Sequence, residues 1–245
     1  IADFRRRDIA AGGQGAPLVP AFHQAFFGNT DKNQIIVNIG GIANITILNA
    51  QNYQKTIGFD TGPGNTLMDQ WIQKNLHIAY DENGNWAKSG KVSTNLVSRL
   101  KQDPYFKTPP PKSTGKEYFS LRWLDQKIES IHIGVSPEDV QASLCQLTVE
   151  TITEAIKAYA PETDVVLMCG GGIHNRFLFQ QIQQSLTCPV ISTADQGIHP
   201  DHVEAMAFAW LAKQTIHGKS GNLMEVTGAK APVILGGIYF APPLL

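Results

Sequence analysis

Residues 34–48 read QIIVNIGGIANITIL, the clearest strand pattern in the sequence. Two runs rich in β-branched residues, Ile35–Ile39 and Asn44–Leu48, flank the pair Gly40-Gly41. β-Branched residues favour strands, and paired glycines between two such runs favour a tight turn. The stretch therefore predicts a β-hairpin.

The segments around the hairpin alternate between strand and helix patterns. Strands are predicted at 56–59, 165–168 and 189–192, and helices at 66–76, 92–101, 120–128, 136–160, 175–186 and 202–217. The clearest helix start is Ser136-Pro137-Glu138-Asp139, which has an N-cap serine, proline at the first helical position and carboxylates near the positive end of the dipole. A hairpin followed by this alternation indicates an α/β domain with helices packed on a mixed sheet.

Two regions lack a regular pattern. Residues 3–20 contain three glycines and two prolines and are predicted to be a loop between elements. Residues 80–120 are polar and irregular apart from the helix at 92–101, and they end in the stiff stretch Pro109-Pro110-Pro111 and a short polar segment.

Composition excludes several classes of protein. The 245 residues carry a net charge of −1, with 42% hydrophobic and 17% charged side chains, which is typical of a compact enzyme-like domain without a nucleic-acid footprint. No apolar run approaches the ~18 residues of a membrane span. The three cysteines have neither metal-ligand spacing nor a disulfide framework, so we expect free thiols and a cytoplasmic protein.

Three glycine-containing segments are candidates for ligand binding. In Asn38–Asn44 the paired glycines let backbone N–H groups approach a phosphate, although on this feature alone a plain hairpin turn is the favoured explanation. In Gly170-Gly171-Gly172, which follows a buried strand, the entropic cost of three glycines favours close approach of a nucleotide. Neither this turn nor Ser113-Thr114-Gly115-Lys116 has the spacing of a dinucleotide-binding or Walker A loop.

Two carboxylates are candidates for catalysis. Asp60 is predicted to end a strand and precede a rigid Gly-Pro loop, where α/β proteins place ligands, so it is a candidate general base. Its alternative role is to cap its own turn. Glu204 lies in the first turn of a predicted helix, where matching the helix dipole is the simpler explanation. The histidines show no metal-ligand spacing, and no metal ligand is predicted.

Taken together, these segments resemble the anhydro-N-acetylmuramic acid kinases, a family of the actin, hexokinase and heat-shock ATPase superfamily. The motifs that carry the resemblance occur in the family's order and cover nearly the whole chain: DFRRRDIAAGGQGAPLVP, NIGGIANIT, GFDTGPGN, PPPKSTGKEYF, CGGGIHN and EAMAFAWLA. The resemblance implies an RNase H-like (actin/hexokinase-type) α/β lobe. It divides the chain into a substrate loop at 1–20, an ATPase-like lobe at 21–220 and a tail at 221–245.

The resemblance also implies an activity. The family uses ATP and Mg²⁺ to open 1,6-anhydro-N-acetylmuramic acid with water and to phosphorylate its O6, a step of cell-wall recycling. Another amino-sugar kinase and a non-catalytic sugar- or nucleotide-sensing module remain alternatives. The expected partners are the sugar and ATP, and no nucleic acid or membrane is expected. Formation of a homodimer remains an alternative.

The family's site residues transfer to matching positions in this chain. Asp60 would be the catalytic base and Glu204 a second carboxylate that orients the water. The other implied residues contact ATP (Asn38, Gly40, Gly41, Asn44, Gly170, Gly171, Gly172, Asn175) or the sugar (Arg5, Asp8, Gln14, Gly62, Pro63, Asn65).

One family feature has no match here. Family members begin with a lobe that carries a G-T-S-[LM]-D-G phosphate loop, and this sequence contains no such motif. We therefore expect the N-terminal lobe to be largely absent from this chain and the chain alone to have little or no kinase activity.

Overall fold

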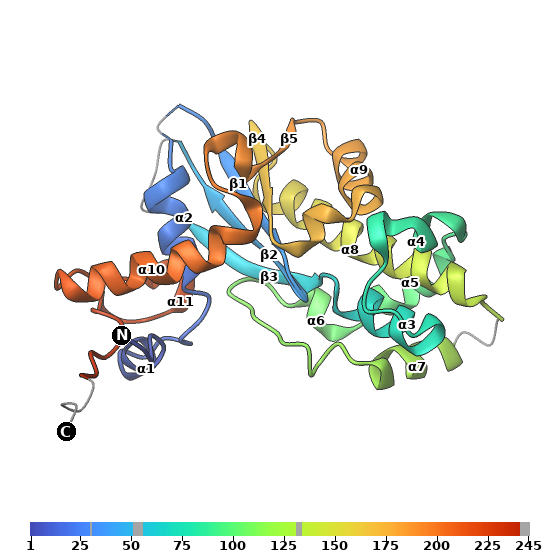
Figure 1. The fold of residues 1–245 in the computed structure, drawn as a ribbon, viewed down its shortest axis with the longest axis horizontal. Coiled ribbons are helices and arrows are strands. Elements are labelled where there is room, and N and C mark those ends of the chain that lie inside the picture. The colour runs from blue at the N-terminus through green and yellow to red at the C-terminus, as the bar shows by residue number, and fades with distance from the viewer. Residues whose placement is uncertain (30, 51–55, 131–133, 241–245) are drawn as a thin grey trace, which may run out of the picture.

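A five-stranded mixed sheet forms the centre of the molecule (Figure 1). The computed structural model describes residues 1–29, 31–50, 56–130 and 134–240. The strands, in the order β3-β2-β1-β4-β5, are β1 (Gln34–Ile39), β2 (Ile42–Leu48), β3 (Ile57–Pro63), β4 (Val165–Cys169) and β5 (Val190–Ser192). β1, β2 and β3 pair antiparallel, whereas β4 and β5 continue parallel to β1.

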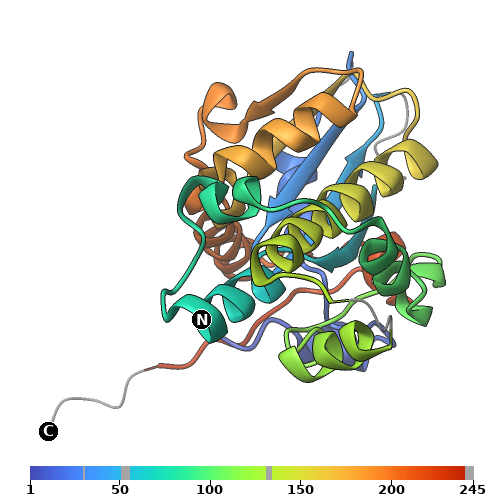
Figure 2. The same ribbon diagram turned by 90° about the vertical axis from the view of Figure 1, so that its right-hand side faces the viewer.

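Helices cover both faces of this sheet. Helices α2 and α10 lie on one face, and α8 and α9 lie on the other, with α3, α4, α5 and α7 beyond them (Figures 1 and 2). The helices are α1 (Arg6–Ala10), α2 (Val19–Phe27), α3 (Thr66–Leu76), α4 (Asn85–Ser89), α5 (Thr94–Lys101), α6 (Pro104–Lys107), α7 (Leu121–Glu129), α8 (Pro137–Tyr159), α9 (Arg176–Ser185), α10 (Val203–Ile216) and α11 (Met224–Thr227). Within the described residues, four short 3₁₀ turns lie between them: Glu82–Gly84, Gly171–His174, Thr193–Gln196 and Pro200–His202. The α/β class and the mixed sheet flanked by helices are therefore confirmed.

Alternation along the strands produces two cores. Ile35, Val37 and Ile39 of β1 pack into the large cluster under α8. Ile36 points to the other face and packs with Phe22 and other residues of the α2 and α10 side. Because successive strand residues face opposite sides of a sheet, this strand is apolar on both faces.

Several helices begin and end where the sequence predicts. Helix α3 has the expected bounds, and the α7 and α8 starts are capped by Ser120 and Ser136, whose hydroxyls accept hydrogen bonds from Trp123 N–H and Asp139 N–H. Other elements differ. The 3–20 segment contains the five-residue helix α1 and the start of α2, and the 80–120 region contains α4 and α6 besides α5.

The expected end of the third strand is wrong. β3 continues through Asp60 to Pro63, so Asp60 lies within the strand. Proline is tolerated at position 63 because β3 lies at the edge of the described sheet. No further strand pairs with its outer side, so the N–H that proline lacks is not needed for a hydrogen bond there. Thr61 is the extra residue of a bulge, since Asn44 pairs with Asp60 while Ala43 pairs with Gly62.

The N- and C-terminal segments pack on each other beside α10. Ala2 forms a bridge with Gly237, and Leu18 packs with Leu211 and Leu235. Asp8 is fully buried at the centre of this contact. Its carboxylate accepts hydrogen bonds from Gly15 N–H (2.8 Å), Thr227 Oγ1–H (2.7 Å) and Asn222 Nδ2–H (2.9 Å). The bonds from Asn222 and Thr227 connect residues that are more than 200 positions apart in the sequence.

Replacing Asp8 with alanine is expected to lower the free energy of unfolding by about 2–4 kcal/mol, because three donors lose their shared acceptor in a buried site. Thermal denaturation would detect this as a clear fall in Tm. Asp125→Ala is the matched control, since its carboxylate is exposed and a surface ion pair contributes about 0–1 kcal/mol. Equal losses in the two variants would contradict the buried-hub assignment of Asp8.

Candidate functional site

The hairpin turn between β1 and β2 is tied to the start of α3 by backbone hydrogen bonds. The Gly40 carbonyl accepts from Asn65 N–H (2.8 Å), and the Gly41 carbonyl accepts from Gly64 N–H (2.9 Å) and Thr66 N–H (3.0 Å). A Cβ atom on Gly64 would overlap the Gly40 carbonyl oxygen. A glycine is therefore required where the helix start meets the turn.

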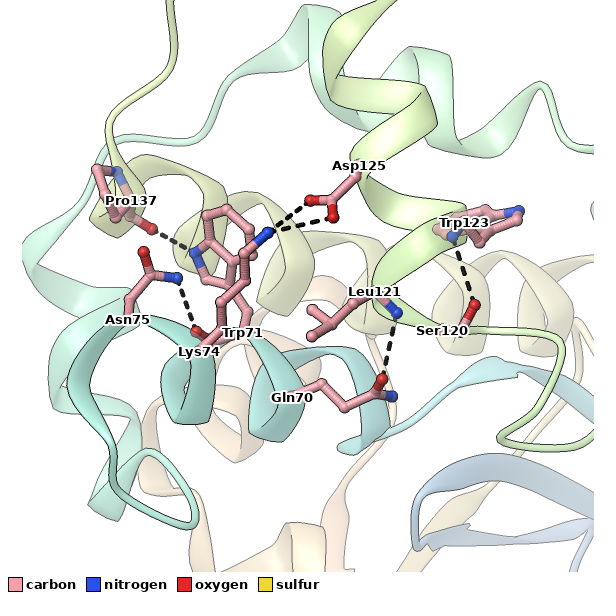
Figure 3. A network of polar contacts seen from close by, with 9 residues as sticks. All are labelled: Gln70, Trp71, Lys74, Asn75, Ser120, Leu121, Trp123, Asp125 and Pro137. Atoms are coloured by element: carbon pink, nitrogen blue, oxygen red, sulfur yellow. Dashed lines mark hydrogen bonds and ion pairs between the residues drawn. The ribbon is translucent and has the colours of Figure 1, made fainter.

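Helix α3 is held in place by its neighbours (Figure 3). Trp71 Nε1–H donates to the Pro137 carbonyl at the start of α8 (2.8 Å), and Lys74 pairs with Asp125 of α7. The Gln70 side chain accepts from Leu121 N–H (3.2 Å). These contacts fix the direction of α3 and so position the two residues of its first turns that face the ligand region, Asn65 and Asp69.

The glycine turn after β4 packs against the end of β1. Gly170 has φ +79° and ψ 172°, a conformation that only glycine adopts readily. A Cβ on Gly170 would overlap Asn38 Oδ1, and one on Gly172 would overlap the Ile39 side chain, whereas Gly171 is open. Gly170 and Gly172 are therefore required by close packing, whereas Gly171 between them faces open space.

Two adjoining hollows lie between these turns and α3. The first, of about 590 Å³, is lined by residues of the glycine turn, of α3 and of the segment before α4: Asn65, Met68, Asp69, Tyr80, Asp81, Glu82, Asn83, Gly171, Ile173, His174, Asn175 and Arg176. The second, of about 550 Å³, is lined by Gly40, Gly41, Asn65, Thr66, Asp69, Gln70, Lys116 and Glu117. Asn65 and Asp69 line both hollows, so the two adjoin at α3, and together they are called the recess.

Asn65 and Asp69 form the shared wall of this recess. The Asn65 side chain does not cap α3 but donates to the Ile39 carbonyl at the end of β1 (3.4 Å). Burial raises the pKa of Asp69 to about 6, opposed by the nearby positive charge of Lys116 and reinforced by the negative charge of Asp81. The recess therefore contains a carboxylate that changes charge near neutral pH.

Asp60 lies outside the described lining of both hollows. Its carboxylate accepts a hydrogen bond from Thr114 N–H (2.9 Å), and its own N–H donates to the Lys112 carbonyl (3.1 Å). Burial raises the pKa of Asp60 to about 6, although the Thr114 bond and the Lys112 charge act to lower it. Tyr105 Oη–H donates to the Asp60 carbonyl (2.7 Å), which fixes the backbone at this residue.

A polar row crosses the sheet from Asp60 to the glycine turn. Asp60 pairs with Asn44, Asn44 with Asn38, and Asn38 with Cys169, so their side chains share one face. This is the face that packs against α2 and α10. Three strand spacings separate the ends of the row, roughly 14 Å.

Glu204 of α10 belongs to the far end of this row. Its side chain is exposed, and its negative charge contributes, after burial, to raising the pKa of the Cys169 thiol to about 12. Asp60 and Glu204 therefore approach the same face of the sheet from opposite ends. That these two carboxylates together orient one water molecule stays a prediction.

The other residues expected to contact the sugar are distributed differently. Arg5 and Gln14 are exposed in the N-terminal segment, while Gly62 and Pro63 are buried within β3. Asp8 is buried and hydrogen-bonded to its own chain, and its contact with the sugar stays a prediction. Asn65 lies at the recess, beside the residues expected to bind the nucleotide.

Sequence reasoning missed Asp69 and Lys116. Asp69 lies four residues after Asn65 on α3, and this spacing places both on one helix face, a signal that was available. Lys116 belongs to the Ser-Thr-Gly-Lys segment that fails the Walker A pattern. Its proximity to Gly41 depends on the path of the chain after the helix at 92–101, where the sequence has no periodic signal.

No group of three or more His, Cys, Asp or Glu side chains suited to a metal ion occurs within the described residues. Over the same part of the chain, no helix combines the length and apolar character needed to cross a membrane. The three cysteines are free thiols.

Sequence comparison identifies close relatives. The family profile described as "Anhydro-N-acetylmuramic acid kinase" matches residues 1–241. Proteins named anhydro-N-acetylmuramic acid kinase from Coxiella burnetii (strain Dugway 5J108-111) and Pasteurella multocida (strain Pm70) are each 49% identical to the chain, over 243 and 241 residues. Both matches cover 98% of this chain, which spans 64% and 63% of the relatives' own lengths.

Comparison with solved structures gives more distant matches. The activator of the 2-hydroxyisocaproyl-CoA dehydratase from Clostridium difficile with bound ADPNP has a TM-score of 0.48 at 15% identity, covering 77% of this chain and 62% of that one. Component A of the (R)-2-hydroxyglutaryl-CoA dehydratase from Acidaminococcus fermentans has a TM-score of 0.46 at 11% identity, covering 71% and 60%.

Proposed function

The chain belongs to the anhydro-N-acetylmuramic acid kinase family, and on this premise we propose that it supplies the nucleotide site and the general base of an ATP-dependent sugar kinase. The proposed reaction adds water to C1 of 1,6-anhydro-N-acetylmuramic acid and transfers the γ-phosphoryl group of ATP to the released O6. The product is N-acetylmuramic acid 6-phosphate, an intermediate of cell-wall recycling.

The observation that carries this proposal is the recess between the hairpin turn and the glycine turn, whose two hollows adjoin at Asn65 and Asp69. Gly171 and Asn175 line its first hollow, where we place the adenosine. Gly40 and Gly41 line the second, where we place the phosphates. In this arrangement Gly170, Gly172 and Asn38 support the glycine turn from behind. The single recess thus supports a nucleotide bound along α3, with Asn65 and Asp69 at its middle.

Asp60 is suited to remove a proton from water. Water is a poor nucleophile near neutral pH, so a positioned carboxylate must accept its proton as the C1–O bond forms. A carboxyl with a pKa of about 6 is mostly ionised at pH 7 and still a stronger base than an exposed aspartate. The C1–O6 bond breaks in the same step, and O6 then attacks the γ-phosphorus, so both events must occur in one cleft.

The polar row supplies the remaining contacts of the proposed sugar site. The Asn44 and Asn38 amides lie between Asp60 and the Glu204 end and can each donate and accept hydrogen bonds. We propose that the sugar lies along this row, with Glu204 on the far side. Arg5 and Gln14 remain proposed contacts from the N-terminal segment.

Mg²⁺ is part of the proposed nucleotide complex. Protein sites for Mg²⁺ with ATP use one or two carboxylates together with the phosphates. Asp69, a half-buried carboxylate that lines both hollows, fits that requirement. When bound, the ion would offset the negative charge that accumulates on the phosphoryl group. The three free thiols support a reducing compartment, and we propose the cytoplasm.

Coupled ADP-release assays on the full-length gene product that carries this sequence test the proposal. We expect ADP release that requires 1,6-anhydro-N-acetylmuramic acid, with one sugar 6-phosphate formed per ADP. Preferential phosphorylation of another amino sugar would instead identify a related kinase. Sugar and ATP binding without turnover would identify a sensing module, and absence of ATP binding would overturn the proposal.

A further inference from the structure

A short loop connects Asp60 to the phosphate end of the recess. The Lys112 carbonyl and Thr114 N–H bond to the main chain and carboxylate of Asp60. Two residues later, Lys116 extends over Gly41 of the hairpin turn, so that a Cβ on Gly41 would overlap Lys116 Cε and lie 3.1 Å from its Nζ atom. Residues 112–117 therefore contact the candidate base and cover the hairpin turn.

The Lys116 ammonium is available for a ligand. Within the described part of the chain, neither Lys116 Nζ nor Gly41 N–H has a hydrogen-bond acceptor, and Lys116 has no ion-pair partner within 4.0 Å. Lys116 is the sole cation in the described lining of the second hollow. Two carboxylates share this hollow. Asp69 lies close enough to Lys116 for the lysine to lower its pKa, while the Glu117 carboxylate folds back against Gly115.

A bound phosphate group would satisfy both of these donors. Glycine at position 41 leaves room for the lysine stem, so the lysine ammonium lies close to a hairpin turn whose Gly41 N–H has no acceptor within the described residues. Charge-assisted hydrogen bonds from an ammonium to phosphate oxygens are among the stronger polar contacts in proteins.

We propose that Lys116 binds a phosphate group of the nucleotide, and that the 112–117 loop sets the positions of Lys116 and Asp60 together. The inference rests on the proposed function, because it requires a nucleotide in the recess. It assigns a ligand contact to a segment whose Ser-Thr-Gly-Lys sequence does not form a Walker A loop. It also predicts that phosphate binding and placement of the base are connected through one stretch of backbone.

The test compares ATP with adenosine as probes. In the full-length gene product, Lys116→Met removes the charge and keeps an aliphatic stem over Gly41. We expect ATP affinity, measured by isothermal titration calorimetry, to fall about 10- to 100-fold, as expected for loss of hydrogen bonds to a charged group. Adenosine affinity should stay within twofold, and Lys116→Arg should restore most of the ATP affinity. Lys157→Met, in the exposed last turn of α8, is the control and should leave both affinities unchanged.

Each other outcome has a separate meaning. If the unaltered protein binds ATP and Lys116→Met binds it equally well, the Lys116 inference fails and the proposed function stands. If Lys116→Met weakens ATP and adenosine to the same extent, the lysine supports the recess without contacting phosphate, and the inference also fails. If the unaltered protein binds neither probe, the proposed function fails together with the inference.

Discussion

Replacing Asp60 with asparagine in the full-length gene product is expected to lower kcat by about 10²- to 10⁴-fold, the usual contribution of a general base. Asparagine keeps the size of the side chain, and its carbonyl oxygen can still accept the hydrogen bond from Thr114 N–H. It cannot accept a proton from water. ATP affinity should change less than threefold, because the described lining of both hollows excludes Asp60.

The pH dependence gives a second readout for the same residue. Since the pKa of Asp60 is about 6, kcat/KM of the unaltered enzyme should fall about tenfold per pH unit below pH 6 as the base becomes protonated. The residual activity of Asp60→Asn should lack this acid limb. A variant that retained the limb would assign it to another group, with Asp69, whose pKa is also about 6, as the first candidate.

Stability should move in the opposite direction from activity. A pKa that is higher in the folded state than in the unfolded chain means that ionisation of Asp60 disfavours folding, by up to roughly 3 kcal/mol. This penalty appears as the pH rises from about 4 to about 6 and is complete above that range. At pH 7.5 Asp60→Asn should therefore be at least as stable as the unaltered protein. Normal turnover in this variant, or loss of activity explained by unfolding, would refute the assignment as base.

The sequence contains the elements of this fold because local chemistry specifies them. The β-branched runs around Gly40-Gly41 form β1 and β2 as predicted, and Ser120 and Ser136 cap helices at the predicted positions. These features depend on residues within a few positions of each other. The end of β3 was missed because Pro63 is acceptable only at a sheet edge, and the position of a strand in the sheet is a property of the whole fold.

Part of the candidate site could also be predicted, because some of its features depend on residues that are neighbours in the sequence. Glycine pairs and triplets mark close approach of backbone, and Gly41 and Gly171 do line the recess. Burial of Asp8 could not be inferred locally, because two of its partners lie more than 200 residues away. Lys116 likewise reaches the hairpin turn through residues 102–116, where the sequence predicts no regular element, so no sequence pattern connects the two.

Alanine at Gly170 is expected to destabilise the protein by about 2–5 kcal/mol. Its φ of +79° with ψ of 172° costs about 1–3 kcal/mol for a residue with a side chain, and the new Cβ would overlap Asn38 Oδ1 and lie 2.8 Å from the Ile39 carbonyl oxygen. Relief would require the glycine turn to move away from β1. That movement would distort the first hollow, so adenosine binding should be lost along with several degrees of Tm.

Alanine at the neighbouring Gly171 separates packing from ligand contact. A Cβ there would meet no atom closer than Asn65 Nδ2 at 4.0 Å, so the free energy of unfolding should change by less than about 1 kcal/mol. The added methyl group would nevertheless project from a residue that lines the hollow, and adenosine affinity should fall several-fold. Loss of stability at 171 with tolerance at 170 would reverse the packing described for this turn. Unchanged adenosine affinity in a stable Gly171→Ala variant would instead remove the nucleotide from the first hollow.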